Sequence, residues 1–597
     1  MNKIFGIAFL SLFILAVGCQ SGSTDSSGDS ATSNKEYKDQ VVLHSLSDPE
    51  GLHPHCTTDA SATEIKRNMF HRLLEYDHKT LKLVPLLAKT LPTVEMVGDK
   101  AGMIIDYELK DGATWDDGTP ITAEDVAFSF KACRNSKVNA ASIRPYIEFI
   151  EDIKLYPENP LKIRFICNKV YFLWDHVTGT DVIIAPKKFY DPEGLSDKFT
   201  YKQIASGDKK VLESDANMAF AKHYNDIKFQ RENLSGSGPY KFKQWDTGKR
   251  VILERKTDWW GDKYASEGMY FEKGPKTLIY ETINDFNAAL TSLKNEDLDV
   301  MAGFKPVQWF EDIPNSKTFN ANFKKYVEQS LSYSYLGLNT RAPHLSGQKT
   351  RMALAHLVDK ANINENLLYN DAVPCIGPIH PKFKEDYNNS IQDYEYNVEK
   401  AKKLLAEDGW EDSNNDGNLD KVIDGSRQDF VIDYTYNKGS DTRQKVGLAF
   451  QESARGVGIK VNVIPSEWAV FLQKLSAHQI DMWFGGWVFD PRPSDPKQIW
   501  HTESYNGGSN YTGFGNEYTD ELIEKIRLEL DDSKRSVLYK EWQQILHDEV
   551  AYIFMYTGKR KMGIHKRFDN LHLTSRSPGF LVSAFQPGKG FSPTLVD

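Results

Sequence analysis

The interpretation of this sequence starts at Gly485-Gly486-Trp487-Val488-Phe489-Asp490-Pro491-Arg492-Pro493-Ser494-Asp495-Pro496. The preceding residues, 479–484, begin with alternating polar and apolar side chains and predict a short strand. Two glycines followed by prolines predict that this strand breaks and continues as a rigid loop. The loop presents an indole at Trp487 and a carboxylate at Asp490, and loops on a rigid scaffold often hold binding residues. An ordinary proline-rich turn, with the indole in the core and the carboxylate capping the turn, is the simpler alternative.

The N-terminal residues predict a signal peptide over 1–18. Residues 4–17 form an apolar run behind Lys3, and this run is too short to span a bilayer as a stable helix. It ends at Gly18-Cys19, which resembles a bacterial lipobox, so we expect cleavage before Cys19 and lipidation of its thiol. An unlipidated secretory signal is the alternative. Residues 19–36 are mostly small and polar and predict a flexible tether, so we expect the protein in the cell envelope, lipid-anchored on the periplasmic side of the membrane.

Length, charge and cysteine spacing narrow the classes of protein that fit this chain. Its 597 residues allow two to four domains. The net charge of −10 argues against nucleic acid as a partner and against a basic surface for anionic lipid. No CxxC pair occurs, so a zinc site is not indicated. An exported compartment permits disulfides, but spacing gives no pairing for the four remaining cysteines, which are Cys56, Cys133, Cys167 and Cys375.

Three further groups of residues suggest chemistry that we do not favour. His53-Pro54-His55-Cys56 contains metal-ligand types, but we expect these histidines on the surface of a polar loop. Asp116-Asp117 precede a glycine and are better explained as closing a hairpin than as catalytic acids. Residues 412–420 match the first half of a calcium loop, but Ile423 stands where a bidentate Glu is expected, so a polar hairpin loop is preferred. With no GxSxG, Walker A or HExxH motif either, we predict no catalytic residue, no metal and no cofactor.

Strand and helix patterns alternate along most of the chain. A strand is predicted at 40–46 and a β-α-β unit over 278–301. Thr122 and Asp125 form a capping-box pattern at the start of a helix over 123–134. Other helices are predicted at 62–75, 216–224, 468–477 and 534–548. The expected fold class is therefore α/β (mixed α+β).

Six stretches carry a family resemblance, and they are residues 81–88, residues 110–126, Gly236-Ser237-Gly238-Pro239-Tyr240 with Trp259-Trp260, residues 336–339 with 351–359, residues 401–410, and Gly486-Trp487-x-x-Asp490. In order and content they resemble the motifs of the oligopeptide/dipeptide-type extracellular solute-binding proteins of ABC importers, the cluster C periplasmic binding proteins. The resemblance covers almost the whole chain beyond the tether and identifies it as a lipoprotein member of that family.

This resemblance implies a two-lobe periplasmic-binding-protein clamp with an additional domain. Domain I would combine residues 37–75, 236–335 and 550–597. Residues 76–235 would form the extra domain II, and residues 336–549 would form domain III, the second ligand-binding lobe. Ligand would bind in the cleft, the lobes would close about a hinge, and the closed form would dock on the permease subunits of an ABC importer.

The resemblance also implies roles for individual residues in the loop. Asp490 would hold the α-ammonium group of a bound peptide, and Trp487, next to Gly486, would wall a side chain. Composition adds three candidate lining residues, Tyr505, Asn506 and Tyr511. The implied partners are a peptide or other small-molecule ligand and the importer permease, with no nucleic acid and with a monomeric chain.

One departure from the family pattern bears on the ligand. Pro491-Arg492-Pro493-Ser494 intervenes before Asp495-Pro496, so Arg492 would partly neutralise Asp490, or the shifted spacing would change which acid faces the cleft. No residue is assigned to a peptide's C-terminal carboxylate. The alternatives are the same fold binding an oligosaccharide, a nickel chelate or haem, and, further away, a lipid-anchored hydrolase.

Overall fold

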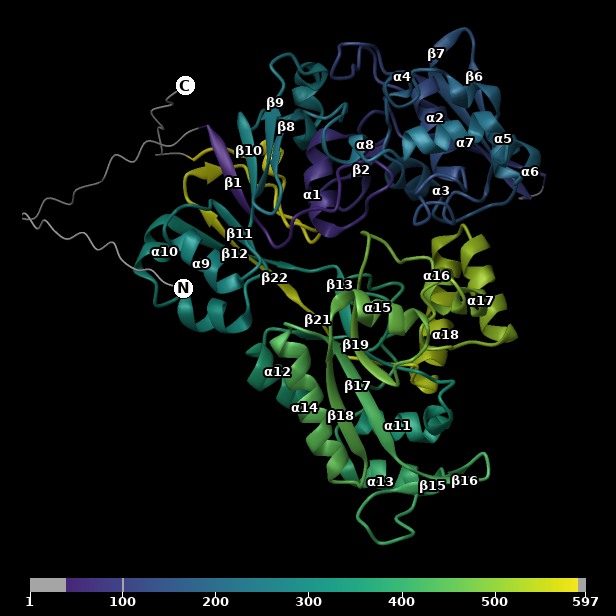
Figure 1. The fold of residues 1–597 in the computed structure, drawn as a ribbon, viewed down its shortest axis with the longest axis vertical. Helices are drawn as coiled ribbons and strands as arrows, with labels where there is room; N and C mark the ends of the chain where they lie inside the picture. Colours follow the sequence, from purple (N-terminus) through teal and green to yellow (C-terminus); the bar gives the residue numbers. More distant parts are fainter. Residues whose placement is uncertain (1–38, 99–100, 589–597) are drawn as a thin grey trace, which may run out of the picture. The chain divides into compact units, whose positions relative to one another are not determined.

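A seven-stranded sheet joins segments from both ends of the chain in the computed structural model, which describes residues 39–98 and 101–588 (Figure 1). The outward and inward side chains of β1 alternate in burial, as expected for a strand with one face on the core. β1 pairs in parallel with β10 and β11, and α9 (Phe286–Lys294) connects those two strands, which confirms the predicted β-α-β unit. The strand order is β12 (Phe323–Gln329), β22 (Lys559–His565), β11 (Val300–Ala302), β1 (Gln40–Ser45), β10 (Thr277–Thr282), β9 (Arg250–Arg255) and β8 (Tyr240–Asp246).

A four-stranded antiparallel sheet lies within residues 93–167. Its order is β4 (Thr93–Val97), β5 (Gly102–Glu108), β7 (Asn159–Cys167) and β6 (Ile150–Tyr156). α2 (Ala123–Arg134) has the predicted bounds and begins with the predicted capping box, because the Asp125 carboxylate accepts the Thr122 N–H at 2.9 Å. The apolar positions of α2 are buried in a core that includes inward-facing residues of β5 and β7.

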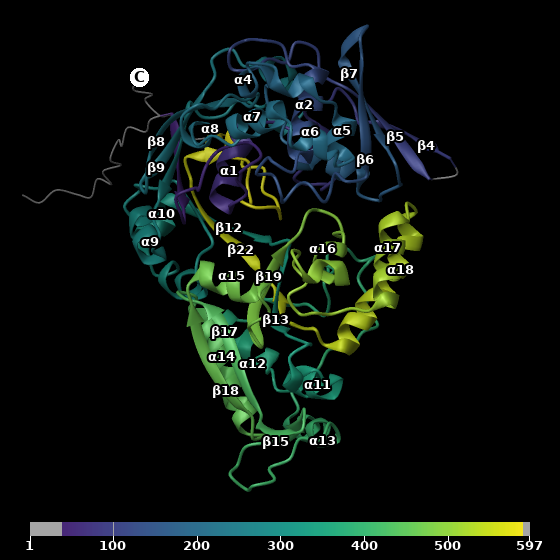
Figure 2. The same cartoon turned by 45° about the vertical axis from the view of Figure 1, so that its right-hand side comes forward.

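A five-stranded mixed sheet carries the loop from which the sequence analysis starts. Its order is β18 (Lys460–Ser466), β17 (Val431–Asn437), β19 (Met482–Val488), β13 (Ser332–Leu338) and β20 (Tyr552–Phe554). α14 (Asp441–Arg455) packs along β18 (Figure 2). On β13 and β20 the rings of Tyr335 and Tyr552 stack with their centroids 3.6 Å apart, within a large aromatic core.

The prediction that the strand breaks at the two glycines is wrong. β19 begins at Met482 and continues through both glycines to Val488, paired with β13 along its whole length. A Cβ on Gly485 would lie 2.4 Å from the Tyr335 ring, which the stack on β20 holds in place. The glycine therefore makes room for an aromatic side chain of the neighbouring strand, and it does not end the strand.

The first helix is shorter than predicted, and its early end matters for the site. α1 (Ala60–Met69) stops before Phe70, whose backbone is extended, and β2 (Leu74–Tyr76) begins four residues later. The carbonyl of Met69 accepts the N–H of Gly238, and the N–H of His71 binds the Ser237 hydroxyl. Pairing with this distant segment competes with the last helical turn, which the local apolar period could not reveal.

Each of the three sheets is built mainly from the chain segments of one predicted domain. Two strands differ from this prediction. β13 begins at Ser332 and β20 lies at 552–554, yet both strands belong to the five-stranded sheet and not to the seven-stranded one. The domain boundaries remain a prediction. The described residues, 39–98 and 101–588, belong to one compact unit. The signal peptide, Cys19 and the tether lie outside the described residues, within which no helix is long and apolar enough to cross a membrane.

The loop histidines are buried, which contradicts the expectation that they lie on the surface. Both nitrogens of the His55 ring have partners, the Tyr224 hydroxyl at 2.6 Å and the Ile183 carbonyl at 2.7 Å, so this ring holds the fold together. Residues 412–420 form a turn closed by their own side chains, and a hairpin follows it; the preference for a polar loop over a calcium loop stays a prediction. The four described cysteines are unpaired.

The remaining helices and strands, with the bounds that the structure gives them, are β3 (Leu83–Pro85), α3 (Trp174–His176), α4 (Lys187–Tyr190), α5 (Tyr201–Ala205), α6 (Lys209–Leu212), α7 (Asp215–Tyr224), α8 (Lys228–Arg231), α10 (Lys317–Asn322), α11 (Gln348–His356), α12 (Lys360–Leu368), β14 (Val373–Pro374), α13 (Val398–Glu407), β15 (Asp420–Ile423), β16 (Ser426–Asp429), α15 (Trp468–Ser476), α16 (Lys497–Trp500), α17 (Glu517–Leu528), α18 (Asp532–Glu549), β21 (Tyr556–Thr557), β23 (Phe568–Asp569) and β24 (Gln586–Pro587). α7, α15 and α18 match their predicted helices to within two residues.

Candidate functional site

A cavity of about 450 Å³ opens beside the loop that follows β19. This volume falls within the range of sites that enclose small ligands. Its walls come from segments that are distant in the sequence, and they combine charged side chains with aromatic and aliphatic ones. The lining residues are Arg67, Arg72, Ser142, Ile143, Tyr146, Leu173, His176, Val177, Thr180, Asp181, Tyr333, Pro378, Ile379, Trp487, Val488, Phe489, Asp490, Arg492, Pro493, Ser494, Asp495, Pro496, Gln498, Ile499, Trp500, Trp542 and Arg576.

Asp490 projects into this cavity from the chain just beyond β19. Its side chain is 51% exposed, and Oδ2 lies 3.4 Å from Nε2 of His176. The same ring nitrogen lies 3.2 Å from Oδ1 of Asp181. On the other side of the ring, Nδ1 is 2.8 Å from the Tyr76 hydroxyl and 2.9 Å from that of Thr180. The imidazole is therefore held from both sides, with one nitrogen shared between two carboxylates.

These contacts set the charges at the Asp490 end of the cavity. Burial lowers the pKa of His176, but the carboxylates of Asp181 and Asp490 outweigh it and raise the pKa well above 6.5. Burial likewise raises the pKa of Asp490, but His176, Arg576 and Arg67 together hold it well below 3.8. At neutral pH the site therefore contains an imidazolium beside the ionised carboxylate of Asp490.

Arg492 does not neutralise Asp490 as the sequence suggested. Its guanidinium binds the carboxylate of Asp175 instead, with Nη1 2.6 Å from Oδ1. The second acid of the loop, Asp495, also reaches the cavity wall but is 4% exposed and bonded to Arg527. Of the two acids that the spacing left open, Asp490 is the one that presents its carboxylate to the cavity.

The two other predicted residues of the loop differ in position. Trp487 lines the cavity and donates its indole N–H to the Tyr552 hydroxyl at 3.3 Å. Gly486 lies in β19 opposite Ser334, where a Cβ would come within 3.1 Å of the Tyr333 carbonyl oxygen, and it is not among the lining residues.

The three residues proposed from composition lie away from the cavity. Tyr505 stacks on His478 with ring centroids 3.8 Å apart and carries the Arg341 guanidinium over its ring at 4.0 Å. Asn506 ends the short 3-10 helix Thr502–Tyr505, and Tyr511 packs at the edge of the aromatic core. None of the three lines the cavity. Composition lacked the register that would have shown which way these side chains point.

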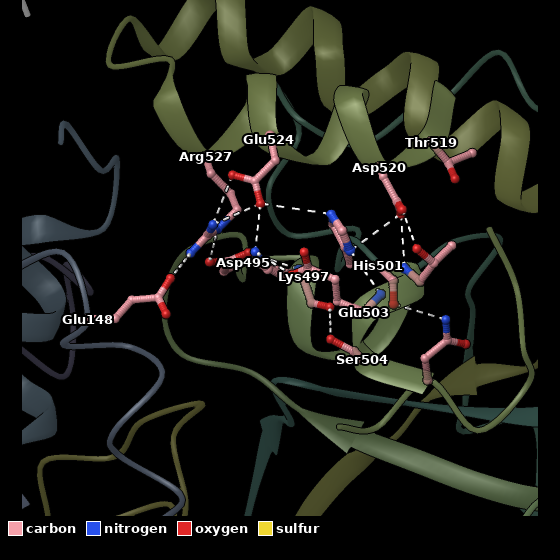
Figure 3. A network of polar contacts seen from close by, with 12 residues as sticks. Glu148, Asp495, Lys497, His501, Glu503, Ser504, Thr519, Asp520, Glu524 and Arg527 are labelled. Atoms are coloured by element: carbon pink, nitrogen blue, oxygen red, sulfur yellow. Dashed lines mark hydrogen bonds and ion pairs between the residues drawn. The ribbon is translucent and has the colours of Figure 1, made fainter. Parts of the chain in front are cut away.

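A network of paired charges stabilises one wall of the cavity (Figure 3). Arg527 on α17 donates from Nε to Asp495 at 2.8 Å and from Nη1 to both oxygens of Glu524 at 3.0 Å. Its remaining nitrogen, Nη2, lies 3.7 Å from Glu148, which comes from the segment before the four-stranded sheet's β6. The Tyr171 hydroxyl donates to Asp495 at 2.8 Å, so the acid has partners on two sides.

A second group of arginines also lines the cavity, and the sequence analysis did not predict it. Arg67 is on α1, Arg72 follows the early end of that helix, and Arg576 comes from the C-terminal segment. Arg576 binds Glu75 at 2.5 Å, and Arg72 approaches the same carboxylate to 4.0 Å. These residues are up to 509 positions apart, so no spacing in the sequence signals that they meet.

Comparison with known proteins places the chain in a defined group. The family described as bacterial extracellular solute-binding proteins, family 5, matches residues 82–510. The oligopeptide-binding protein AppA of Bacillus subtilis (strain 168) is 26% identical over 94% of this chain and 93% of the relative.

Solved structures show that the fold is shared as well. The structure of AppA from Bacillus subtilis in complex with a nonapeptide superposes with a TM-score of 0.72 at 23% identity, over 93% of this chain and 100% of that one. NikZ from Campylobacter jejuni in complex with Ni(L-His) gives a TM-score of 0.70 at 23% identity, over 91% of this chain and 97% of that one. The predicted mixed α/β fold of periplasmic binding proteins is confirmed.

Proposed function

This chain belongs to the bacterial extracellular solute-binding proteins, family 5, and from that membership we propose that it captures a peptide in the 450 Å³ cavity and delivers it to the permease of an ABC importer. It does so without chemical change to the ligand. AppA is an oligopeptide-binding protein, and it is similar to this chain over nearly the whole length of both. This similarity favours a peptide over the other solutes that this fold binds.

The observation that carries this proposal is the ionised, half-exposed carboxylate of Asp490 inside the cavity. The Nε2–H of His176 can donate to only one acceptor well, and it lies nearer Asp181 than Asp490. The carboxylate of Asp490 therefore keeps lone pairs for a ligand's α-ammonium group. An ammonium enclosed without such a partner would cost several kcal/mol, so the carboxylate selects for a free amino terminus.

The end of β19 offers a second feature that suits a peptide. Among the described residues, β17 pairs only with Met482 and Trp483 of this strand, so residues 484–488 have a strand partner on the β13 side alone. Val488, at the end of this edge, lines the cavity and is 73% exposed. We infer that the backbone of an extended peptide binds this edge by strand-like hydrogen bonds, with its amino terminus toward Asp490.

We further infer that the contacts across the cavity belong to the closed form of a clamp. The segment 142–181 and the segment 490–535 meet through the pairs Asp175–Arg492, His176–Asp490, Tyr171–Asp495 and Glu148–Arg527. Opening would break these contacts together and expose the cavity. In this proposal the three-domain division given above holds except that β13 and β20 belong to the second lobe, the chain acts as a monomer, and a lipid at Cys19 keeps it near the permease.

Native mass spectrometry of the gently purified full-length protein tests the proposal together with thermal unfolding in the presence of peptides. We expect peptide masses to co-purify, and added peptide to stabilise the protein by about 2.7 kcal/mol at a hundred times its Kd. Asp490→Asn should lose both effects, and Asp258→Asn, on an exposed turn, should keep them. A protein that ignores peptides but is stabilised by nickel with histidine would contradict the proposed ligand and leave the family unchanged.

A further inference from the structure

The group Arg67, Arg72 and Arg576 faces the ligand cavity and a smaller pocket behind it. All three arginines line the 450 Å³ cavity, and all three also line an adjoining pocket of about 50 Å³. Arg67 and Arg576 share a third small cavity with Asp490, so the arginines and the carboxylate belong to one continuous wall. A ligand whose amino terminus is at Asp490 therefore has these guanidinium groups within reach.

The positive charge of this group exceeds the negative charge that the protein places against it. Glu75 is the carboxylate bonded to Arg576, and Arg72 comes no nearer than 4.0 Å to it. Arg67 has no ion pair within 4.0 Å among the described residues and donates to the carbonyl of Ser577. Burial raises the pKa of Glu64, the other acid in the small pocket, to about 7, against the effect of Arg560 and Arg67. The three guanidinium groups thus face two ionised carboxylates, Glu75 and the half-exposed Asp490, and one positive charge is left in excess.

Two donors in the group have no acceptor. In the part of the chain that the structure describes, the Nε atoms of Arg67 and Arg72 are buried without a hydrogen-bond partner. The Nδ1 atom of His71 has no partner either, but burial and Lys256 lower the pKa of this ring to about 3, so it is neutral and only one of its nitrogens carries a proton. His71, which is 4% exposed, lines the small pocket with the two arginines. A buried donor left without a partner destabilises the protein, so this wall gains free energy when an anion enters.

We propose that Arg67, Arg72 and Arg576 form a subsite for a carboxylate of the bound ligand. The inference rests on the proposed function and deepens it, because it specifies a ligand with a carboxylate close to the ammonium group held by Asp490. Guanidinium groups bind carboxylates through paired, charge-assisted hydrogen bonds, and free Nε–H donors suit that geometry. Two sources supply the same chemistry, the C-terminus of a short peptide and an acidic side chain near its amino terminus.

Calorimetric titration with matched peptides tests the subsite in the full-length protein. The probes are trialanine, trialanine amide, and Asp-Ala-Ala amide, which moves the only carboxylate to a side chain. We expect wild type to bind at least one of the two acids about tenfold to a hundredfold more tightly than trialanine amide. Preference for trialanine assigns the subsite to the C-terminus, and preference for Asp-Ala-Ala amide assigns it to a side chain. Equal binding of all three overturns the proposal.

Two variants locate the effect. In Arg67→Gln the preference for the peptide with a carboxylate over trialanine amide should fall below about threefold. The reason is that one unpaired guanidinium is removed. In Arg455→Gln it should persist, since that arginine is exposed, pairs with Glu452 and does not line the cavity. An unchanged preference in Arg67→Gln, with its circular dichroism like that of wild type, overturns the assignment to this group.

A probe without an ammonium group separates this proposal from the peptide hypothesis. Thermal unfolding is measured with millimolar succinate and with succinamide. The subsite predicts that succinate stabilises wild type more than succinamide does, and that Arg67→Gln loses the difference, even if no peptide binds. An equal response of wild type to both compounds overturns the subsite, whereas loss of peptide binding alone contradicts only the proposed function.

Discussion

Two groups of arginines border the same cavity. They differ in how many of their N–H donors have an acceptor in the protein. The guanidinium of Arg527 directs each of its three nitrogens at a carboxylate, those of Asp495, Glu524 and Glu148 (Figure 3). Arg67 and Arg72 leave buried Nε donors without acceptors among the described residues. Arginine near a cavity therefore does not by itself indicate ligand binding. The difference between the two groups lies in the donors that the fold leaves free.

The two acids of the loop show the same contrast. Asp495 is 4% exposed and is bonded to Arg527 and Tyr171, whereas Asp490, five residues earlier, is 51% exposed toward the cavity. They carry the same charge and sit in the same proline-rich segment. One holds two segments together, and the other is available to a ligand.

The largest effect on stability is expected from replacing Arg527, whose three nitrogens all point at carboxylates. Arg527→Met leaves Asp495 buried opposite an apolar side chain, and breaking a buried ion pair in this way costs about 3–5 kcal/mol. The free energy of unfolding from urea titration checks this value. A cost below 1 kcal/mol would show that the network in Figure 3 adds little to stability and would remove the contrast between the two groups.

An intermediate effect is expected from pH, because the proton that charges His176 is lost as pH rises through its raised pKa. The pKa of His176 is raised above 6.5 by Asp181 and Asp490, so its charge stabilises the fold below 6.5 and this contribution is lost as pH rises through the raised pKa. The hydroxyls of Tyr76 and Thr180 are its polar neighbours at the other ring nitrogen.

We expect the loss to reach at most about 2 kcal/mol, since Asp490 is half exposed and the contact is partly screened. Unfolding free energies of wild type and His176→Gln, measured from pH 6 to 9, check this. The wild-type value should fall toward that of the variant with rising pH. Parallel curves would show that His176 does not carry a proton between the two acids.

The smallest effect on stability is expected from a substitution at Arg67, in the group whose Nε donors lack acceptors. Arg67→Met removes a guanidinium that has no carboxylate partner among the described residues, so its loss relieves surplus positive charge while the apolar stem is kept. We expect a change within about 1 kcal/mol in the same urea titration. A cost as large as that of Arg527→Met would place Arg67 in the structural framework, together with Arg527.

Most of the local structure could be predicted, and the exceptions share one cause. α2 has its predicted bounds because the capping box lies within four residues of sequence. The end of α1 was missed because Gly238 takes the Met69 carbonyl from a distance of 169 residues. The break predicted in β19 was wrong because the glycine at position 485 is explained by the Tyr335 ring of a neighbouring strand, which leaves no room for a Cβ there. Where a distant segment competes with local preference, local patterns do not reveal the outcome.

The sequence by itself determined the family, the alternation of strands and helices, and the loop that borders the cavity, because each depends on motifs and periods that are continuous in the chain. Only the tertiary structure decided the charges around it. Arg492 pairs with Asp175 over 317 residues, and Arg576 pairs with Glu75 over 501. Coulomb energy depends on separations of a few ångströms, and sequence distance carries no information about those once the chain has folded.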